Sequence, residues 1–172
     1  MWSNIFLESD LESHPRARKI LELFPKSPVT KISSYDEYWG RFKKPYLHKR
    51  DELNLYLAQK KGQLVKMAPD AYGLSGEPHY YFIHAYNCIY ECQYCYLQGH
   101  FNTPDLVLFL NHEDIILEMK EAMNKHDNHV WFHAGEFSDS LALSHLTGEL
   151  PIYFDFFYQN PKAYLELRTK SA

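Results

Sequence analysis

The chain has 172 residues, of which 45% are hydrophobic, and a formal net charge of −4 with ten histidines. This length and composition suit one globular core with a small appendage. No run of about 18 apolar residues occurs, which excludes a membrane-spanning segment, and we expect no secretory signal in the first ten residues.

The first part of the chain, residues 1–78, is expected to form a small α/β extension. Its end is placed near Pro78 because residues 69–78 are rich in proline and glycine, which are typical of loops. The expected elements, in chain order, are a strand at 3–8, a helix at 15–24 capped by Ser13, a strand at 28–32 and a helix at 52–60.

The second part, residues 79–172, alternates strands with helices, which predicts an α/β fold with a parallel sheet. Residues 80–85 form a continuous apolar and aromatic run, as expected for a strand that is buried on both faces. The further expected elements are strands at 106–110, 130–134 and 164–169, a helix capped by Asn111, and a helix at 151–158 that begins at Pro151.

Basic and aromatic residues alternate between Arg41 and Lys61. Such a mixture can follow a phosphate backbone, or it can form a solvated helical surface, since Asp51 and Glu52 lie within it. The net acidic charge of the chain favours the solvated surface. The basic residues of this stretch are Arg41, Lys43, Lys44, Lys49, Arg50, Lys60 and Lys61, and its aromatic residues include Phe42, Tyr46 and Tyr56.

Cys88, Cys92 and Cys95 are the three cysteines of the chain, and they have the spacing C-x3-C-x2-C directly after the run at 80–85. Three soft thiolates on one loop suit a [4Fe–4S] cluster in which the fourth iron stays open for another ligand. No cysteine remains to form a disulfide framework, which favours a reducing, cytoplasmic location.

Two other interpretations of the cysteines stay open at this point. The three positions also fall at helical spacing, so they could line the buried face of a helix. Alternatively they could bind zinc, with His84 or His100 as the fourth ligand, in a non-catalytic metal-binding or interaction fragment. Zinc sites usually combine two separated ligand pairs, and the sequence contains no second pair.

The cysteine motif resembles the cluster loop of the radical S-adenosylmethionine (SAM) superfamily, with Tyr94 as the aromatic residue before the last cysteine. The longer string CQYCYLQ at 92–98 is similar to one branch, the spore photoproduct lyase family. Residues 138–147 resemble the segment after that family's second strand, and residues 165–171 resemble its third strand. The resemblance covers essentially the whole chain.

The resemblance implies that the three cysteines hold a [4Fe–4S] cluster and that SAM is cleaved reductively to a 5′-deoxyadenosyl radical. Tyr94 would lie near the adenine. Ser138 and Lys170 match family positions that contact SAM, and an ammonium group suits the SAM carboxylate. Asp139 also matches, and Glu136 resembles the glutamate that receives the SAM ammonium in many radical SAM enzymes.

Structural roles are open for several of these residues. Ser138 and Asp139 could cap a following helix, Lys170 could be solvated, and Tyr94 could belong to the core. One departure from the family concerns Glu136, which stands where photoproduct lyases keep the cysteine that returns a hydrogen atom. Tyr96 matches a tyrosine implicated in that return and is the remaining catalytic candidate.

The length from Tyr80 onward accommodates about three β–α units of roughly 30 residues each. A radical SAM core resembles three-quarters of a (β/α)8 barrel with six strands. We therefore expect an incomplete partial barrel with about three parallel strands, inactive by itself. The strand at 164–169 would be an open edge, and the expected partners are a C-terminal half from another chain, an electron donor of flavodoxin or ferredoxin type, and DNA.

Overall fold

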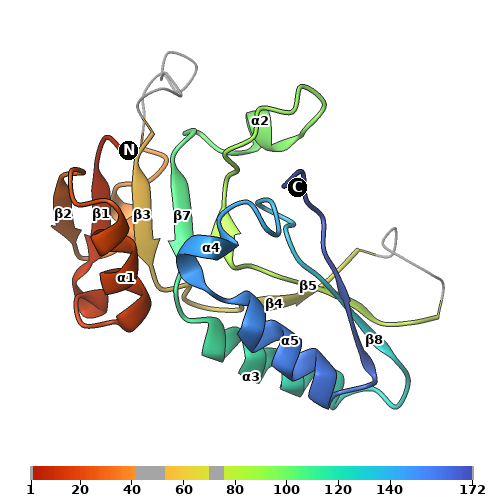
Figure 1. The fold of residues 1–172 in the computed structure, drawn as a ribbon. Coiled ribbons are helices and arrows are strands. Elements are labelled where there is room, and N and C mark those ends of the chain that lie inside the picture. The colour runs from red at the N-terminus through yellow and green to blue at the C-terminus, as the bar shows by residue number, and fades with distance from the viewer. Residues whose placement is uncertain (1, 42–52, 70–75, 172) are drawn as a thin grey trace. The chain divides into compact units, whose positions relative to one another are not determined.

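A computed structural model describes residues 2–41, 53–69 and 76–171 of the chain (Figure 1). The chain divides into two compact units, Met1–Gln59 with Ala85–Leu110, and Lys60–His84 with Asn111–Ala172. These units are groups of residues in contact. The division expected near Pro78 is of a different kind, along the sequence, and stays a prediction.

The first unit contains a five-stranded sheet that is mostly parallel. Its strands, in chain order, are β1 (Ile5–Glu8), β2 (Val29–Ile32), β3 (Leu55–Ala58), β6 (Ala85–Tyr86) and β7 (Leu106–Phe109). They lie in the order β2-β1-β3-β7-β6, and only β6 is antiparallel to its neighbour. Its helices are η1 (Ser9–Leu11), α1 (Pro15–Leu23), η2 (Tyr35–Glu37) and α2 (Leu97–His100).

The expected strand, helix and strand at the start of the chain are confirmed as β1, α1 and β2. Pro15 begins α1. Proline lacks a backbone N–H, and the N–H of the first helical residue has no acceptor within the helix, so nothing is lost at this position. The residue before the helix is His14, so the expected cap at Ser13 is wrong by one position. Ala17 and Ile20 form the buried side of α1.

The helix expected at 52–60 is wrong. Residues Leu55–Ala58 form strand β3, which pairs in parallel with β1 on one side and with β7 on the other. All four of its residues are buried. A central parallel strand has no solvent-facing side, so its sequence is a continuous apolar run without alternation. The charged residues that flank this short run suggested helix, but the sheet pairing decides its conformation.

The second unit contains a four-stranded sheet in the order β4-β5-β8-β9. Its elements are β4 (Val65–Met67), β5 (His79–Phe82), α3 (His112–Met123), β8 (Val130–His133), α4 (Ser144–Thr147), α5 (Leu150–Gln159) and β9 (Ala163–Glu166). Strands β5, β8 and β9 are parallel and β4 is antiparallel to β5. The expected set of about three parallel strands with helices is therefore confirmed.

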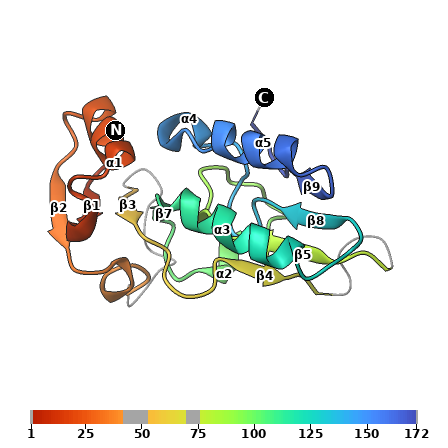
Figure 2. The same cartoon turned by 90° about the horizontal axis from the view of Figure 1, so that it is seen from below.

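The helices α3 and α5 cover one face of this sheet, as Figures 1 and 2 show. A hydrophobic core lies between these helices and the sheet. Every second residue of a strand contributes to it, because successive side chains of a strand point to opposite faces. The core side chains from the strands include Tyr80, Phe82, Val130, Phe132 and Ala163, and those from the helices include Ile115, Met119, Tyr153 and Phe156.

Several expected boundaries differ in detail. The run at 80–85 is divided into β5 and β6, which belong to different sheets, and the strand expected at 164–169 is shorter, as β9. Asn111 does precede α3, but its side chain binds the backbone of Lys60 and the carboxylate of Asp114. Within the part of the chain that the structure describes, β9 pairs only with β8 and lies at the edge of its sheet.

The mixed cluster of basic and aromatic residues falls largely outside the described residues, because it includes residues 42–52. Among the residues that are described, no helix combines the length and the apolar character that crossing a membrane requires.

Candidate functional site

The three cysteines lie on an irregular segment of the first unit, between β6 and α2. Each is half-buried and none forms a disulfide. A single turn, in which the backbone N–H of Cys95 donates to the carbonyl oxygen of Cys92 at 3.0 Å, precedes α2. The segment 88–95 contains no helix, so the interpretation of a cysteine stripe on a buried helical face is wrong.

Asn87 fixes the beginning of the cysteine loop. Its side-chain Nδ2 donates to the carbonyl oxygens of Thr103 at 2.6 Å and Asp105 at 2.8 Å. Its φ of 64° places it in the left-handed region, which asparagine adopts more readily than most residues. The buried amide thus stabilises the sharp change of direction that leads from β6 into the loop.

An aromatic cluster holds both ends of the same loop. Tyr86, which precedes the loop, stacks on Trp39 with a ring-centroid distance of 5.3 Å, and Phe101, which follows α2, meets Trp39 edge-on at 4.9 Å. Tyr86 and Phe101 are also in contact with each other, at 5.2 Å. The indole N–H of Trp39 donates to the carbonyl oxygen of Asp105 at 3.0 Å. The loop is therefore closed on a rigid base.

Replacing Asn87 separates the contribution of its side-chain hydrogen bonds from that of its left-handed backbone conformation. Asn87→Ala loses two buried hydrogen bonds and keeps the left-handed φ, so we expect it to lower the free energy of unfolding by about 2 kcal/mol. Asn87→Gly loses the same bonds but tolerates the φ, so the loss should be about 1 kcal/mol. Denaturant unfolding measures both values; a glycine variant less stable than the alanine variant would contradict the assigned backbone conformation.

The two tyrosines of the cysteine loop are exposed. Tyr94 is 76% exposed, so the alternative that it belongs to the core is wrong. Tyr96 is 53% exposed and meets the ring of His100 edge-on at 5.4 Å. Both side chains are accessible to a ligand, and their expected roles beside adenine and in hydrogen return stay predictions.

In the second unit, polar residues gather in the segments that follow the carboxyl ends of β8 and β9. Asp139 joins these segments: its Oδ1 accepts hydrogen bonds from the backbone N–H groups of Leu141 and Ala142, both at 2.9 Å, and from Thr169 Oγ1 at 2.7 Å. Its Oδ2 accepts from the backbone N–H of Lys170 at 2.6 Å. Asp139 caps a turn at residues 141–142 and not the following helix α4, whose N-cap is Leu143, so the expected helix cap is wrong. Asp139 also positions the backbone of the exposed residue Lys170.

Ser140 makes a second connection between the same two segments. Its Oγ accepts from the backbone N–H of Arg168 at 2.8 Å, and its own N–H donates to the Arg168 carbonyl oxygen at 3.0 Å. Gly135 lies directly beneath this pair with a φ of 78°, and a Cβ there would be 2.7 Å from Ser140 Oγ. The close approach of the two segments therefore requires glycine at position 135.

His84 follows β5 and lies beneath Ser138. The Ser138 Oγ and His84 Nε2 atoms are 3.3 Å apart. Burial lowers the pKa of His84 to about 4, against the opposing effect of Asp139, so the imidazole is neutral at pH 7. The structure thus places Ser138 on a buried, neutral histidine, which agrees with a core role for His84.

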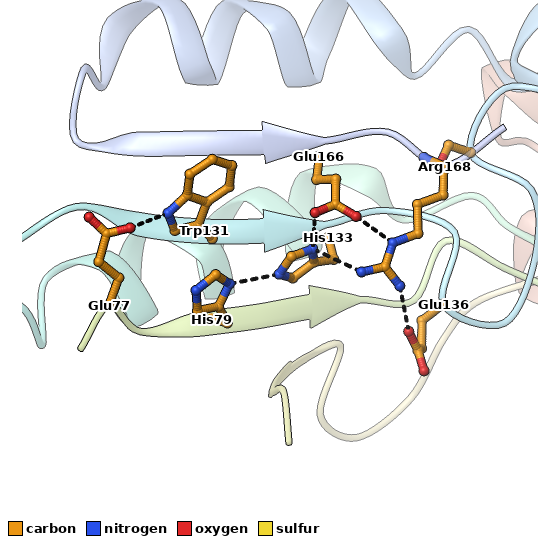
Figure 3. Close-up of polar contacts among 8 residues, drawn as sticks. Glu77, His79, Trp131, His133, Glu136, Glu166 and Arg168 are labelled. Carbon is orange, nitrogen blue, oxygen red and sulfur yellow. Dashed lines mark hydrogen bonds and ion pairs between the residues drawn. The ribbon is translucent and has the colours of Figure 1, made fainter. Parts of the chain in front are cut away.

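A chain of polar contacts extends across the face of this sheet opposite α3 and α5 (Figure 3). We call its five residues, His79, His133, Glu166, Arg168 and Glu136, the charged row. His79 Nδ1 lies 2.9 Å from His133 Nε2, and His133 Nδ1 lies 3.0 Å from Glu166 Oε2. Arg168 Nε donates to Glu166 Oε1 in a short hydrogen bond, and Arg168 Nη1 forms an ion pair with Glu136 Oε2 at 3.6 Å.

Sequence reasoning identified Glu136 but missed the rest of the charged row. It interpreted the strands as buried on both faces, whereas alternate residues of each strand face the core and the charged row. The missed signal was weaker than strict alternation. Residues whose side chains can form hydrogen bonds recur at every second position of these strands, namely His79 and Tyr81, Trp131 and His133, and Tyr164 and Glu166.

The residues expected to hold cofactors are thus distributed over both units: the cysteines and Tyr94 belong to the first unit, and the other candidates belong to the second. Ser138, Asp139 and Lys170 are brought together in the second unit, and Glu136 is linked to them through Arg168. Across the described ranges, no group of three or more histidine, cysteine, aspartate or glutamate side chains has the geometry of a metal site. The fit of the cysteines to a cluster therefore rests on their chemistry, as three half-buried thiols on one loop that form no disulfide.

A triple-cysteine loop and polar residues at the carboxyl ends of parallel strands are both typical of radical SAM proteins. The sequence model described as spore photoproduct lyase matches residues 4–172. The chain belongs to the spore photoproduct lyase family. A search of curated protein sequences finds no match.

Solved structures of spore photoproduct lyases share the fold. A mutant with bound AdoMet and dinucleoside spore photoproduct has a TM-score of 0.75 and 20% identity, over 96% of this chain and 48% of that chain. A lyase complexed with dinucleoside spore photoproduct has a TM-score of 0.72 and 20% identity, over 96% and 48%. Another mutant has a TM-score of 0.75 and 19% identity, over 99% and 50%. This chain spans about half the length of these lyases.

Proposed function

We propose that this chain binds a [4Fe–4S] cluster through Cys88, Cys92 and Cys95 and takes part in the reductive cleavage of SAM to a 5′-deoxyadenosyl radical. The observation that carries the proposal is the loop of three cysteines, none of them in a disulfide, in a chain that belongs to the spore photoproduct lyase family. When bound, such a cluster supplies the electron that breaks a carbon–sulfur bond of SAM.

The residues of the chain would hold the cofactors as follows. The aromatic cluster on Trp39 and the amide of Asn87 keep the cysteine loop closed before any ligand binds. Less conformational entropy of the loop is therefore lost when the cluster binds. Ser138 and Lys170 bind SAM, with the Lys170 ammonium on its carboxylate. Asp139 orients both of their backbone segments, and Glu136 accepts the SAM ammonium.

The substrate proposal is DNA damage of the photoproduct type, with one difference in chemistry. Glu136 stands where the photoproduct lyases have a cysteine that returns a hydrogen atom, and a carboxylate O–H bond is too strong for that step. We therefore assign hydrogen return to Tyr96, whose ring is exposed. The matched lyases are about twice as long as this chain. We propose that turnover requires the part of the lyase fold that this chain does not span, supplied by a C-terminal half, and an electron donor of flavodoxin or ferredoxin type.

Anaerobic reconstitution with iron and sulfide tests the cluster. The wild-type protein should turn brown, bind about four irons per chain and bleach on addition of dithionite. Replacing the three cysteines together by alanine should abolish iron binding, because they are the only thiolates in the sequence. The matched control His100→Ala should keep its iron, since His100 is exposed and belongs to the zinc alternative. A colourless protein with one zinc, or iron content that survives the triple replacement, would contradict the proposal.

A further inference from the structure

Arg168 is shared unequally between two carboxylates of the charged row. Its Nε makes a short hydrogen bond with Glu166, whereas its Nη1 lies 3.6 Å from Glu136. The second distance exceeds the usual range of an N–H···O hydrogen bond, about 2.7–3.2 Å. Arg168 is therefore hydrogen-bonded to Glu166, lies 3.4 Å from His133 Nδ1 through Nη2, and forms a longer ion pair with Glu136.

The backbone of Arg168 is fixed while its side chain is accessible. Ser140 binds both the N–H and the carbonyl oxygen of Arg168. The Arg168 side chain is 41% exposed, and the Glu136 side chain is 16% exposed. A small rotation of the Arg168 side chain is thus enough to withdraw the guanidinium from Glu136, without any change in the backbone.

The charged row carries one negative charge more than it carries positive charge. Glu136 and Glu166 are two carboxylates, and Arg168 is one cation. Burial lowers the pKa of His133, and Arg168 and His79 lower it further, although Glu166 opposes them. His133 is then neutral at pH 7; its Nδ1 lies 3.0 Å from Glu166 Oε2 and 3.4 Å from Arg168 Nη2, and its Nε2 lies 2.9 Å from His79 Nδ1. The row therefore has room for one additional cationic group.

We propose that Arg168, Glu166 and His133 are positioning residues that set the affinity of Glu136 for an ammonium group. The guanidinium of Arg168 competes with that ammonium for Glu136, and Glu166 holds the guanidinium back, with His133 fixing the orientation of Glu166. The inference rests on the proposed function, because the ammonium is taken to be that of SAM. Beyond the proposed function, it states that Arg168 competes with the ammonium for Glu136 and that the net charge of the charged row sets the affinity.

Two variants change the charge balance in opposite directions and a third restores it, and SAM binding to the reconstituted protein measures the result. Arg168→Gln removes the competitor, so SAM should bind about fivefold more tightly, the effect of one charge a few ångströms away at a half-exposed site. Glu166→Gln releases Arg168 to Glu136 and should weaken binding by about fivefold. The double variant restores the original net charge and should bind SAM with nearly wild-type affinity.

Two controls separate competition from misfolding. Arg168→Lys keeps a positive charge but not the forked guanidinium, so its SAM affinity should lie between those of the wild type and Arg168→Gln. 5′-Deoxy-5′-methylthioadenosine lacks the amino-acid part of SAM, so its affinity should be equal in all variants. Equilibrium dialysis under anaerobic conditions gives both affinities, and circular dichroism confirms that each variant is folded.

The pH dependence of SAM binding by the wild-type protein provides a second test. Groups that face His133 are His79 on β5 and Glu166 and Arg168 from β9 and the segment after it. Protonation of His133 cancels the excess negative charge, so SAM affinity should fall about fivefold as the pH falls through the lowered pKa of His133. His133→Gln should remove this pH dependence.

The possible failures are distinguishable. A wild-type protein that takes up iron but binds no SAM contradicts the proposed function and this inference with it. A wild-type protein that binds SAM, together with an Arg168→Gln variant that binds it equally or more weakly, contradicts this inference alone. A pH profile that His133→Gln leaves unchanged also contradicts it.

Discussion

Replacing Gly135 by alanine is expected to lower the free energy of unfolding by about 3 kcal/mol. Two causes combine at this position. The φ of 78° is strained for any residue with a side chain, and the new Cβ would lie 2.7 Å from Ser140 Oγ and 3.2 Å from the Arg168 carbonyl oxygen. Relief requires the segments after β8 and β9 to separate, which breaks the hydrogen bonds between Ser140 and Arg168.

Two other glycines provide matched controls for this prediction. Gly62 has a φ of 75°, and a Cβ at this position would meet nothing within 4 Å, so Gly62→Ala measures the backbone strain alone, about 1 kcal/mol. Gly99 lies in α2, also with nothing within 4 Å, so Gly99→Ala should leave the stability unchanged or raise it by up to about 1 kcal/mol. Thermal and denaturant unfolding measure all three. A Gly135→Ala variant as stable as Gly62→Ala would contradict the close contact.

The sequence predicts the local features of this protein and misses those that depend on strand pairing. The cysteine loop could be identified because its meaning lies in the spacing of three neighbouring residues. The helix α5 could be placed because Pro151 and Asn160 bound an apolar segment. By contrast, the central strand β3 was interpreted as a helix, since nothing in its four residues reveals that β1 and β7 will enclose it.

The contacts of the charged row likewise depend on strand pairing, which the sequence does not reveal. His79 and His133 are 54 positions apart in sequence, and they meet because β5 and β8 pair in a particular parallel register. A shift of that register by one residue would turn His133 toward α3 and α5. Glu166 joins them only through the register of β9 against β8, in which it is the partner of His133. Position in the sequence predicts none of these contacts, although alternation along each strand indicates which residues share a face.

Asp139→Ala is expected to lower the free energy of unfolding by about 3–4 kcal/mol, because it leaves four donors without their acceptor. Those donors are the backbone N–H groups of Leu141, Ala142 and Lys170 and the hydroxyl of Thr169. Three of them are main-chain groups, which lose their hydrogen-bond acceptor when the carboxylate is removed. Asp155→Ala, an exposed change on α5, is the control and should alter the stability by less than about 0.5 kcal/mol.

Conservative variants show which of the four bonds matter most. Thr169→Val keeps the shape of the side chain and loses one bond to Asp139, so we expect a loss of about 1 kcal/mol. Asp139→Asn keeps one acceptor oxygen but directs an amide donor at one of the backbone N–H groups, and its loss should fall between those of the other two variants. If the cluster-loaded Asp139→Asn protein is folded, its SAM affinity should fall several-fold, because Lys170 is then no longer held by the carboxylate. An Asp139→Ala variant with the stability of Asp155→Ala would show that Asp139 does not join the two segments.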